Sequence, residues 1–98
     1  MNIDKQWNGD TLTLKISGKL DALTAPDLES SLNEDIDSIN SLVMDLSELK
    51  YISSAGLRVL LTTQKTMITK GTMIIKNVQK PVMEVFTLTG FVSVLTIE

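Results

Sequence analysis

The 98-residue sequence contains no cysteine and no histidine. Without cysteine the chain has neither a disulfide framework nor a thiol nucleophile. Without histidine it lacks the commonest general base and the commonest metal ligand, and only carboxylate oxygens remain as ligands for hard cations. We therefore expect a protein that is not an enzyme and that holds no metal and no cofactor.

Aromatic residues are also scarce, at 4% of the chain, so the core must be built from Leu, Ile, Val and Met within a hydrophobic fraction of 43%. That is enough apolar material for one compact unit, and we expect a single domain over residues 1–98. The formal net charge is −3 and the cations are scattered. Such an acidic chain has no electrostatic footprint for nucleic acid or for an anionic membrane.

Long apolar runs are missing as well. No uninterrupted run approaches the ~20 residues needed to span a bilayer. The first residues, Met1 to Lys5, lead into no apolar segment of the kind found in a signal peptide. The sequence therefore predicts a cytoplasmic protein.

The N-terminal part has hairpin and helix signals. Asn8-Gly9 between two candidate strands favours a type I′ turn. Apolar residues then alternate with polar ones over residues 11–16, which predicts a half-buried strand that stops at residues 17–18 and is followed by a loop. A helix start is predicted at Thr24, with Thr24 as the cap and Pro26 in the first turn.

Strands and helices alternate through the rest of the chain. The nearly all-apolar run at 42–46 is typical of a strand covered on both faces. The remaining elements are predicted as a helix over 54–70 ended by a left-handed Gly71, a strand over 73–75, a helix from Pro81 to Gly90, and a last strand over 92–97. This order indicates an α/β fold with a mixed, mostly parallel sheet of four to five strands, an N-terminal antiparallel hairpin and three to four helices.

The junction between the strand at 42–46 and the following helix carries Ser53 and Ser54. Unsatisfied N–H groups and the positive end of the helix dipole make this a favourable place for a negative charge. One interpretation is that a serine only caps the helix. The other is that one serine caps while the second is an exposed phosphoacceptor.

Nearby residues also have two interpretations. Asp21 and Asp45 either order their loops as hydrogen-bond acceptors or contribute to a binding site. Gly56 permits a close approach, either to a neighbouring loop or to a partner. Leu23 and Leu57 belong either to the core or to an apolar docking surface.

Three segments closely resemble the STAS domains of bacterial anti-sigma factor antagonists. They are Gly18-Lys19-Leu20-Asp21 with Thr24-Ala25-Pro26, then Tyr51-Ile52-Ser53-Ser54-Ala55-Gly56-Leu57-Arg58-Val59-Leu60-Leu61, then Val85-Phe86-Thr87-Leu88-Thr89-Gly90-Phe91. The resemblance covers almost the whole chain in order. It implies a mixed sheet covered by one layer of helices, and a role in partner switching.

In such a switch the antagonist binds an anti-sigma factor that is also a serine kinase, which frees the sigma factor. Phosphorylation breaks the complex and a serine phosphatase restores it. The family's acceptor lies two positions before the glycine, which is Ser54 here, and Ser53 stands where well-known members often have Asp. Asp45 matches the acid that ends the family's third strand. The resemblance assigns these residues to the partner-binding surface: Asp21, Leu23, Thr24, Ser53, Ala55, Gly56, Leu57 and Arg58.

Two other functions remain open at this stage. STAS domains also serve as docking subunits of transport or lipid-trafficking assemblies, where no phosphorylation is needed. A small-ligand or nucleotide sensor is a third class, although no Gly-rich phosphate loop supports it. We expect the chain to be a monomer on its own.

Overall fold

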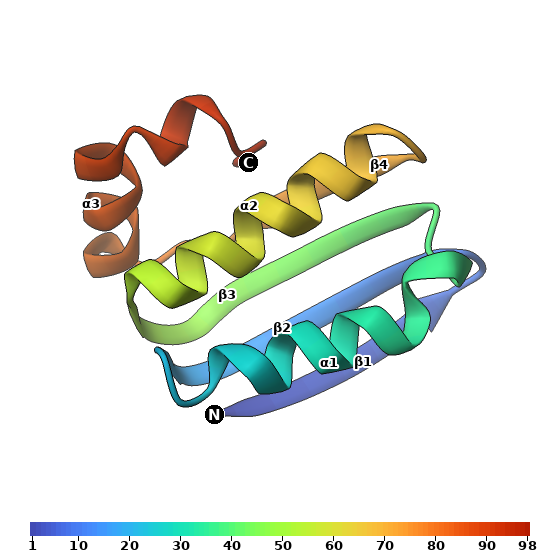
Figure 1. The fold of residues 1–98 in the computed structure, drawn as a ribbon, viewed down its shortest axis with the longest axis horizontal. Coiled ribbons are helices and arrows are strands. Elements are labelled where there is room, and N and C mark those ends of the chain that lie inside the picture. Colours follow the sequence, from blue (N-terminus) through green and yellow to red (C-terminus); the bar gives the residue numbers. More distant parts are fainter.

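The computed structural model describes residues 1–98, which form one four-stranded sheet with two helices along one face and a third helix at one end (Figure 1). The sheet order is β1-β2-β3-β4, with β1 and β2 antiparallel and the other pairs parallel. The elements are β1 (Asn2–Asn8), β2 (Thr11–Leu20), α1 (Ala25–Asp35), β3 (Ser41–Ile52), α2 (Ser54–Ile68), β4 (Thr72–Lys76) and α3 (Lys80–Thr89). The predicted α/β class, mixed sheet and N-terminal hairpin are confirmed.

The hairpin turn differs from the predicted type. Asn8 pairs with Thr11, so the two loop residues are Gly9 and Asp10. Gly9 has φ +64° whereas Asp10 has a negative φ. A glycine in the first loop position with only one positive φ is the pattern of a type II′ turn rather than type I′.

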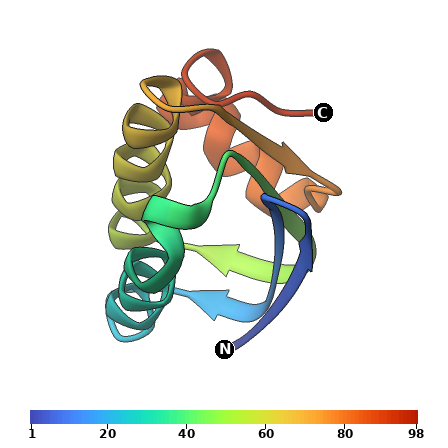
Figure 2. The same ribbon diagram turned by 90° about the vertical axis from the view of Figure 1, so that its right-hand side faces the viewer.

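One face of the sheet carries the core. Along β3, Leu42, Met44 and Leu46 are fully buried while the residues between them are only half-buried. The expectation that this strand is covered on both faces is therefore wrong. Figure 2 shows α1 and α2 side by side along one face, where 22 buried apolar residues form a single cluster. This agrees with the single layer of helices that the family resemblance implies.

Both central strands run further than predicted. β2 continues through Gly18 to Leu20, and β3 continues to Ile52. Their pairing shifts register twice, between Lys15 and Ser17 and between Gly18 and Lys19. Gly18 has φ +91°, which only glycine adopts without strain. Residues 18–20, which the sequence suggested as part of a loop, therefore remain paired with β3. Glycine makes this possible because it adopts the irregular backbone of the bulge.

The C-terminal segment does not form the predicted strand. Phe91–Ser93 is a short 3₁₀ turn, and only Ile97 makes a parallel bridge, to Ile75 of β4. Val92 and Val94 are exposed even though they belong to the alternating apolar pattern. The alternating pattern predicted a strand here. The structure instead has an irregular segment that is anchored by one buried side chain, that of Leu95.

The two glycines expected to end helices behave differently. Gly90 has φ +81° and ends α3 as predicted. Gly71 has no positive φ. A Cβ at Gly71 would lie 1.8 Å from the backbone oxygen of Asn40, so close backbone contact requires the glycine. None of the three α-helices has the length and the hydropathy of a membrane-spanning segment.

Candidate functional site

The loop after β2 and the start of α2 meet at the end of the two central strands. Leu20 pairs with Ile52 in the last position of the β2–β3 register. The Ser53 N–H then donates to the Leu20 carbonyl at 2.9 Å. This bond fixes the chain at the two points from which the Asp21 loop and α2 begin.

Gly56 lets α2 approach this end of the sheet. A Cβ at this position would lie 2.7 Å from Leu20 Cγ and 2.9 Å from Ile52 Cγ1. These distances are too short for any larger residue without movement. The close approach expected of Gly56 is therefore made to the protein's own strands. It holds the first turn of α2 directly over the ends of β2 and β3.

The two serines have different environments. Ser54 is the first residue of α2 and is exposed. Ser53 is the residue before the helix, and its hydroxyl oxygen is buried without a hydrogen-bond partner. Neither serine caps the helix through its side chain. The structure therefore does not support the interpretation that a serine acts only as a side-chain cap, and Ser54 is the exposed serine of the pair.

Asp21 orders the loop beside the serines. Its Oδ1 accepts hydrogen bonds from the N–H groups of Leu23 at 3.0 Å and Thr24 at 3.2 Å. Partial desolvation raises the pKa of the Asp21 carboxyl, but these two bonds and that from the Thr24 hydroxyl outweigh it and leave the pKa below its usual value. Asp21 is therefore an ionised acceptor that fixes the loop next to Ser54.

Thr24 has a role other than the predicted helix cap. Its one hydroxyl hydrogen is shared between the Lys19 carbonyl at 2.9 Å and the Asp21 Oδ1 at 3.2 Å, and its oxygen accepts the Asp21 N–H at 2.9 Å. No side-chain cap bond is made at the start of α1. Thr24 thus closes the loop from both sides and keeps its shape.

A small concavity of about 190 Å³ lies between the first turns of α1 and α2. Its α2 wall is formed by Ala55, Arg58 and Val59. The α1 side contributes residues that were not predicted from the sequence: Ala22, Ala25, Pro26 and Glu29. Helical spacing is the signal that could have found Pro26 and Glu29, since residues three apart share one face of a helix.

The expected docking residues separate into exposed and buried sets. Leu23 is 87% exposed, which favours its interpretation as a surface contact. Leu57 is only 5% exposed and belongs to the core. Gly56 is also buried. For Leu57 the structure thus favours the core interpretation, and neither Leu57 nor Gly56 lies at the surface where the resemblance had placed them.

Asp45 lies away from this site. It is within β3, where its Oδ1 accepts from the Ser47 N–H at 2.9 Å and from Asn77 Nδ2 at 3.2 Å. Desolvation raises the pKa of the Asp45 carboxyl, and the hydrogen bonds and nearby Lys15 lower it more, so the net change is downward. Asp45 therefore orders the turn after β4, as its structural interpretation predicted. It does not end β3 and does not join Asp21.

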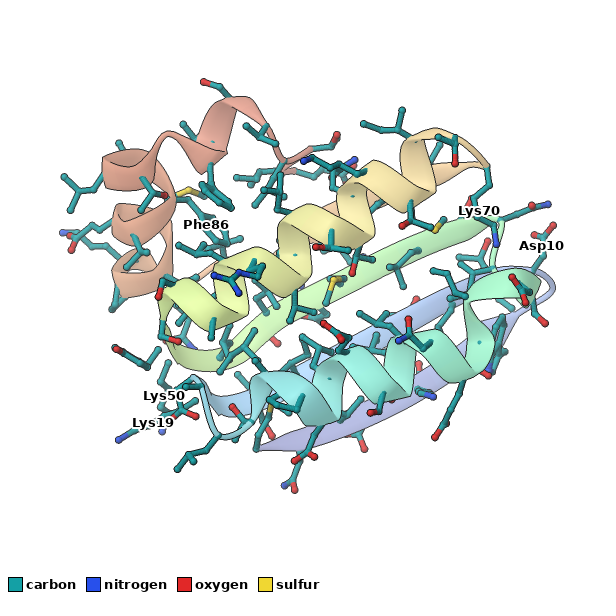
Figure 3. The ribbon with its side chains drawn as sticks, viewed as in Figure 1. Asp10, Lys19, Lys50, Lys70 and Phe86 are labelled. Atoms are coloured by element: carbon teal, nitrogen blue, oxygen red, sulfur yellow. The ribbon has the colours of Figure 1, made fainter.

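Two lysines stand beside the site. Lys19 and Lys50 lie next to each other at the end of β2 and β3, and both are exposed (Figure 3). Neither makes an ion pair, since the ion pairs of the protein involve Lys5 and Lys15 only. The site thus has an ionised acid, an exposed hydroxyl and unpaired cations around the start of one helix. It has no group of three or more acidic side chains that could hold a metal ion.

Comparison with known proteins gives a family match over almost the whole chain. The model of the STAS domain matches residues 2–98. The chain is 34% identical to the putative anti-sigma factor antagonist BtrV of Bordetella bronchiseptica over 84 residues, which cover 84% of this chain and 72% of BtrV. It is 27% identical to the anti-sigma-B factor antagonist of Bacillus subtilis, over 99% of this chain and 90% of that protein.

Solved structures show the same fold at low identity. The anti-sigma factor antagonist SpoIIAA in its unphosphorylated form superposes with a TM-score of 0.83 at 16% identity, covering 99% of this chain and 88% of SpoIIAA. The phosphorylated form of Bacillus SpoIIAA gives a TM-score of 0.77 at 15% identity, covering 99% of this chain and 91% of that one.

Proposed function

This chain belongs to the STAS domain family, and on that premise we propose that it is an anti-sigma factor antagonist switched by phosphorylation of Ser54. In its unmodified form it would bind an anti-sigma factor with serine kinase activity and so release a sigma factor. The observation that carries the proposal is the exposed Ser54 at the first position of α2, beside the ordered Asp21 loop. The names of the relatives support the antagonist role.

The environment of the two serines favours Ser54 as the acceptor. A kinase must reach the oxygen that it modifies, and the Ser53 oxygen is buried whereas Ser54 is exposed. A phosphate on Ser54 adds about −1.5 to −2 charges at neutral pH. The positive end of the α2 dipole favours that charge, so the modification leaves the fold intact. It acts by changing the charge and the volume that a partner meets.

The docking surface comprises the exposed and half-buried residues around Ser54. Leu23 offers an apolar contact, and Asp21 and Arg58 offer charges of opposite sign. The concavity between α1 and α2 receives a side chain of the partner. Burial of a mixed surface of this kind gives specificity through a few central contacts. The protein acts by binding, and no catalytic group takes part.

Phosphorylation by the kinase tests the proposal directly. The serine-kinase anti-sigma factors of the source organism are purified, incubated with the protein and ATP, and the modified residue is mapped by mass spectrometry. We expect the unsubstituted protein and Ser53→Ala to be modified at residue 54, and Ser54→Ala to remain unmodified. Modification of Ser54→Ala at the normal rate would overturn the assignment.

The fold by itself does not separate this role from a docking subunit of a transport assembly. A sulfate transporter family protein from Wolinella succinogenes shares the fold, with a TM-score of 0.75 at 17% identity over 88% of this chain and 71% of that one. Binding measured against purified anti-sigma factors distinguishes the two. Failure of every anti-sigma factor to bind the unmodified protein would favour the transport role.

A further inference from the structure

Arg58 is a cation without a partner one helical turn after Ser54. It is exposed, and it takes part in none of the ion pairs or side-chain hydrogen bonds of the protein. The helix α2 contains no Asp or Glu, so no acid lies three or four residues from Arg58 on either side. Four positions before Arg58 is Ser54, whose side chain carries a hydroxyl group.

Helix geometry puts Ser54 and Arg58 on the same face of α2. Residues i and i+4 lie on the same face, with Cβ atoms roughly 5–6 Å apart. Side chains in an α-helix also lean toward its N-terminus. The long Arg58 side chain can therefore reach the first turn of α2, in which Ser54 is the exposed residue that carries a hydroxyl. Arg58 also forms part of the wall of the concavity between α1 and α2, which makes it a surface residue in the unmodified protein.

We propose that Arg58 is the intramolecular partner of a phosphate on Ser54, and that phosphorylation thereby withdraws this cation from the docking surface. The inference rests on the proposed function. A guanidinium presents its N–H groups in a planar fork that matches two oxygens of a phosphate. The modification then changes the surface in two ways, because it adds negative charge and also occupies a positive group that the partner would use.

The pairing also indicates the partner's chemistry. In the unmodified protein the free Arg58 offers only hydrogen-bond donors and a positive charge. The group that meets it on the anti-sigma factor is therefore an acceptor, a carboxylate or a backbone carbonyl. Once the phosphate holds Arg58, that acceptor faces a phosphate in place of a guanidinium. Like-charge repulsion and a lost hydrogen bond then act in the same direction.

Other charged groups surround the same turn. Lys19 and Lys50 stand at the ends of β2 and β3 (Figure 3), Asp21 lies in the loop before α1, and Glu29 lies on α1 across the concavity. The two lysines are the alternative partners for a phosphate. Asp21 and Glu29 repel it. Arg58 differs from the lysines because it is on the same helix as Ser54 and can form a bidentate contact.

The experiment uses protein in which phosphoserine is installed at position 54 during translation, so no kinase is needed. The phosphorus resonance is followed by NMR as the pH is raised through the second ionisation of the phosphate. A nearby cation favours the doubly charged phosphate, so we expect the midpoint to move to higher pH in Arg58→Ala. Arg58→Lys should give an intermediate midpoint, since lysine keeps the charge but not the fork. Lys50→Ala is the matched control and should leave the midpoint unchanged.

A second readout follows Arg58 itself. The exchange of its Nε hydrogen with water should slow when residue 54 is phosphorylated, because a hydrogen-bonded donor exchanges more slowly. An unchanged midpoint in Arg58→Ala, or a larger change in Lys50→Ala, would overturn the inference. Since the phosphate is installed without a kinase, these results do not depend on whether Ser54 is the natural acceptor. The mapping experiment above decides that separately.

Discussion

At the scale of single residues, the site depends on which groups are held and which are free. Asp21 is held by two backbone N–H groups and the Thr24 hydroxyl. Gly56 is held against Leu20 and Ile52. Ser54 and Arg58, by contrast, are exposed and have no side-chain partner. The rigid residues fix the position of the start of α2, and the free residues are left for a partner or a modification.

Gly56→Ala tests the close approach of α2. The added methyl group would overlap Leu20 and Ile52, and overpacking of this kind costs about 1–3 kcal/mol. Alanine favours a helix over glycine by up to about 1 kcal/mol, so the clash should win. We expect a lower free energy of unfolding in urea. The control is Thr62→Ala, an exposed position in the same helix, which should be neutral or slightly stabilising. A stabilised Gly56→Ala protein would show that the contact is looser than described.

Asp21→Asn tests the electrostatic part of the loop through its pH dependence. The folded-state pKa of Asp21 is lowered, so its contribution to stability is fully present above the pKa of the unfolded chain, near 3.9, and is lost as the pH falls through the folded-state value. Asparagine keeps an acceptor oxygen but does not titrate. The free energy of unfolding should therefore fall less steeply below about pH 5 in Asp21→Asn than in the unsubstituted protein.

Urea unfolding at several pH values between neutral and about 3 gives the slope of the free energy of unfolding against pH for Asp21→Asn and for the unsubstituted protein. Asp37→Asn is the control, because Asp37 is exposed and accepts no side-chain hydrogen bond. It should leave the slope as it is in the unsubstituted protein. Equal slopes for Asp21→Asn and the unsubstituted protein would mean that the loop bonds do not depend on the charge.

At the scale of elements, the site is assembled by two long strands that end together. The extra residues of β2 and β3 carry Leu20 and Ile52 beyond the end of β4, which stops at the level of Asp45 and Lys76. The bulged β2–β3 pair therefore projects past the rest of the sheet. The Asp21 loop and the start of α2 sit on that projection, and α3 also contacts β3.

Leu95→Ala tests how the last segment is attached. This segment makes only two backbone hydrogen bonds with β4, from Ile75 N–H to the Thr96 carbonyl and from Glu98 N–H to the Ile75 carbonyl, each 2.8 Å long. Leu95 is its buried side chain, at 5% exposed. We expect Leu95→Ala to lower the free energy of unfolding by about 2 kcal/mol.

The neighbouring Val94→Ala is the matched control for that experiment. Val94 is 48% exposed, and its loss should change stability by less than about 0.5 kcal/mol. Equal effects of the two substitutions would contradict the view that a single side chain anchors the segment. Urea unfolding of both proteins supplies the comparison.

Sequence patterns predicted those elements whose signals are local. The hairpin, the start of the helix at Pro81 and its end at Gly90 depend on turn and cap residues, and each was found. The extent of β3 was missed because its second half, Ser47 to Tyr51, mixes polar residues with Leu49 and has no clean alternation. The prediction of a last strand was wrong because Val92 and Val94 are exposed and lie outside the core. The period of the apolar residues shows which side chains share one face of a strand. It does not show whether another element of the fold covers that face.

The candidate site was predicted only in part, because local motifs identify its residues but not their exposure. The Ser53-Ser54 pair and Asp21 could be recognised from their motif, and the structure places them side by side. Which serine is exposed could not be read from the sequence, because it depends on how the chain turns from β3 into α2. The predicted place of Asp45 among the site loops was wrong, since the sequence did not show that β3 continues seven residues past it.

At the scale of the whole molecule, the two ends of the sheet differ in how many contacts join neighbouring elements. At the end away from the site, Asn40 Nδ2 donates to Asp10 at 2.6 Å and Lys70 donates to the Ile36 carbonyl. Figure 3 shows Asp10 and Lys70 at this end and Lys19 and Lys50 at the other. The edge strand β1 is linked to α1 because Lys5 donates a hydrogen bond to Asp35 at 2.6 Å. That bond is the main cause of the raised pKa of Lys5. Stabilising contacts between elements thus leave the surface around Ser54 free.

A phosphate on Ser54 should therefore leave the whole molecule folded. The charge lies at a helix start, where it is favourable, and it breaks no hydrogen bond of the unmodified protein. We expect the phosphorylated protein to have a melting temperature equal to or above that of the unmodified protein. A fall in melting temperature would mean that phosphorylation acts by unfolding the domain.

The most direct test of the account is the affinity of an anti-sigma factor for two forms of the chain, unmodified and phosphorylated at Ser54, measured by titration calorimetry at one ionic strength. The account predicts that the phosphate weakens binding at least about 100-fold, which corresponds to about 2.7 kcal/mol, while circular dichroism of the two forms stays the same. Equal affinities for the two folded forms would contradict it.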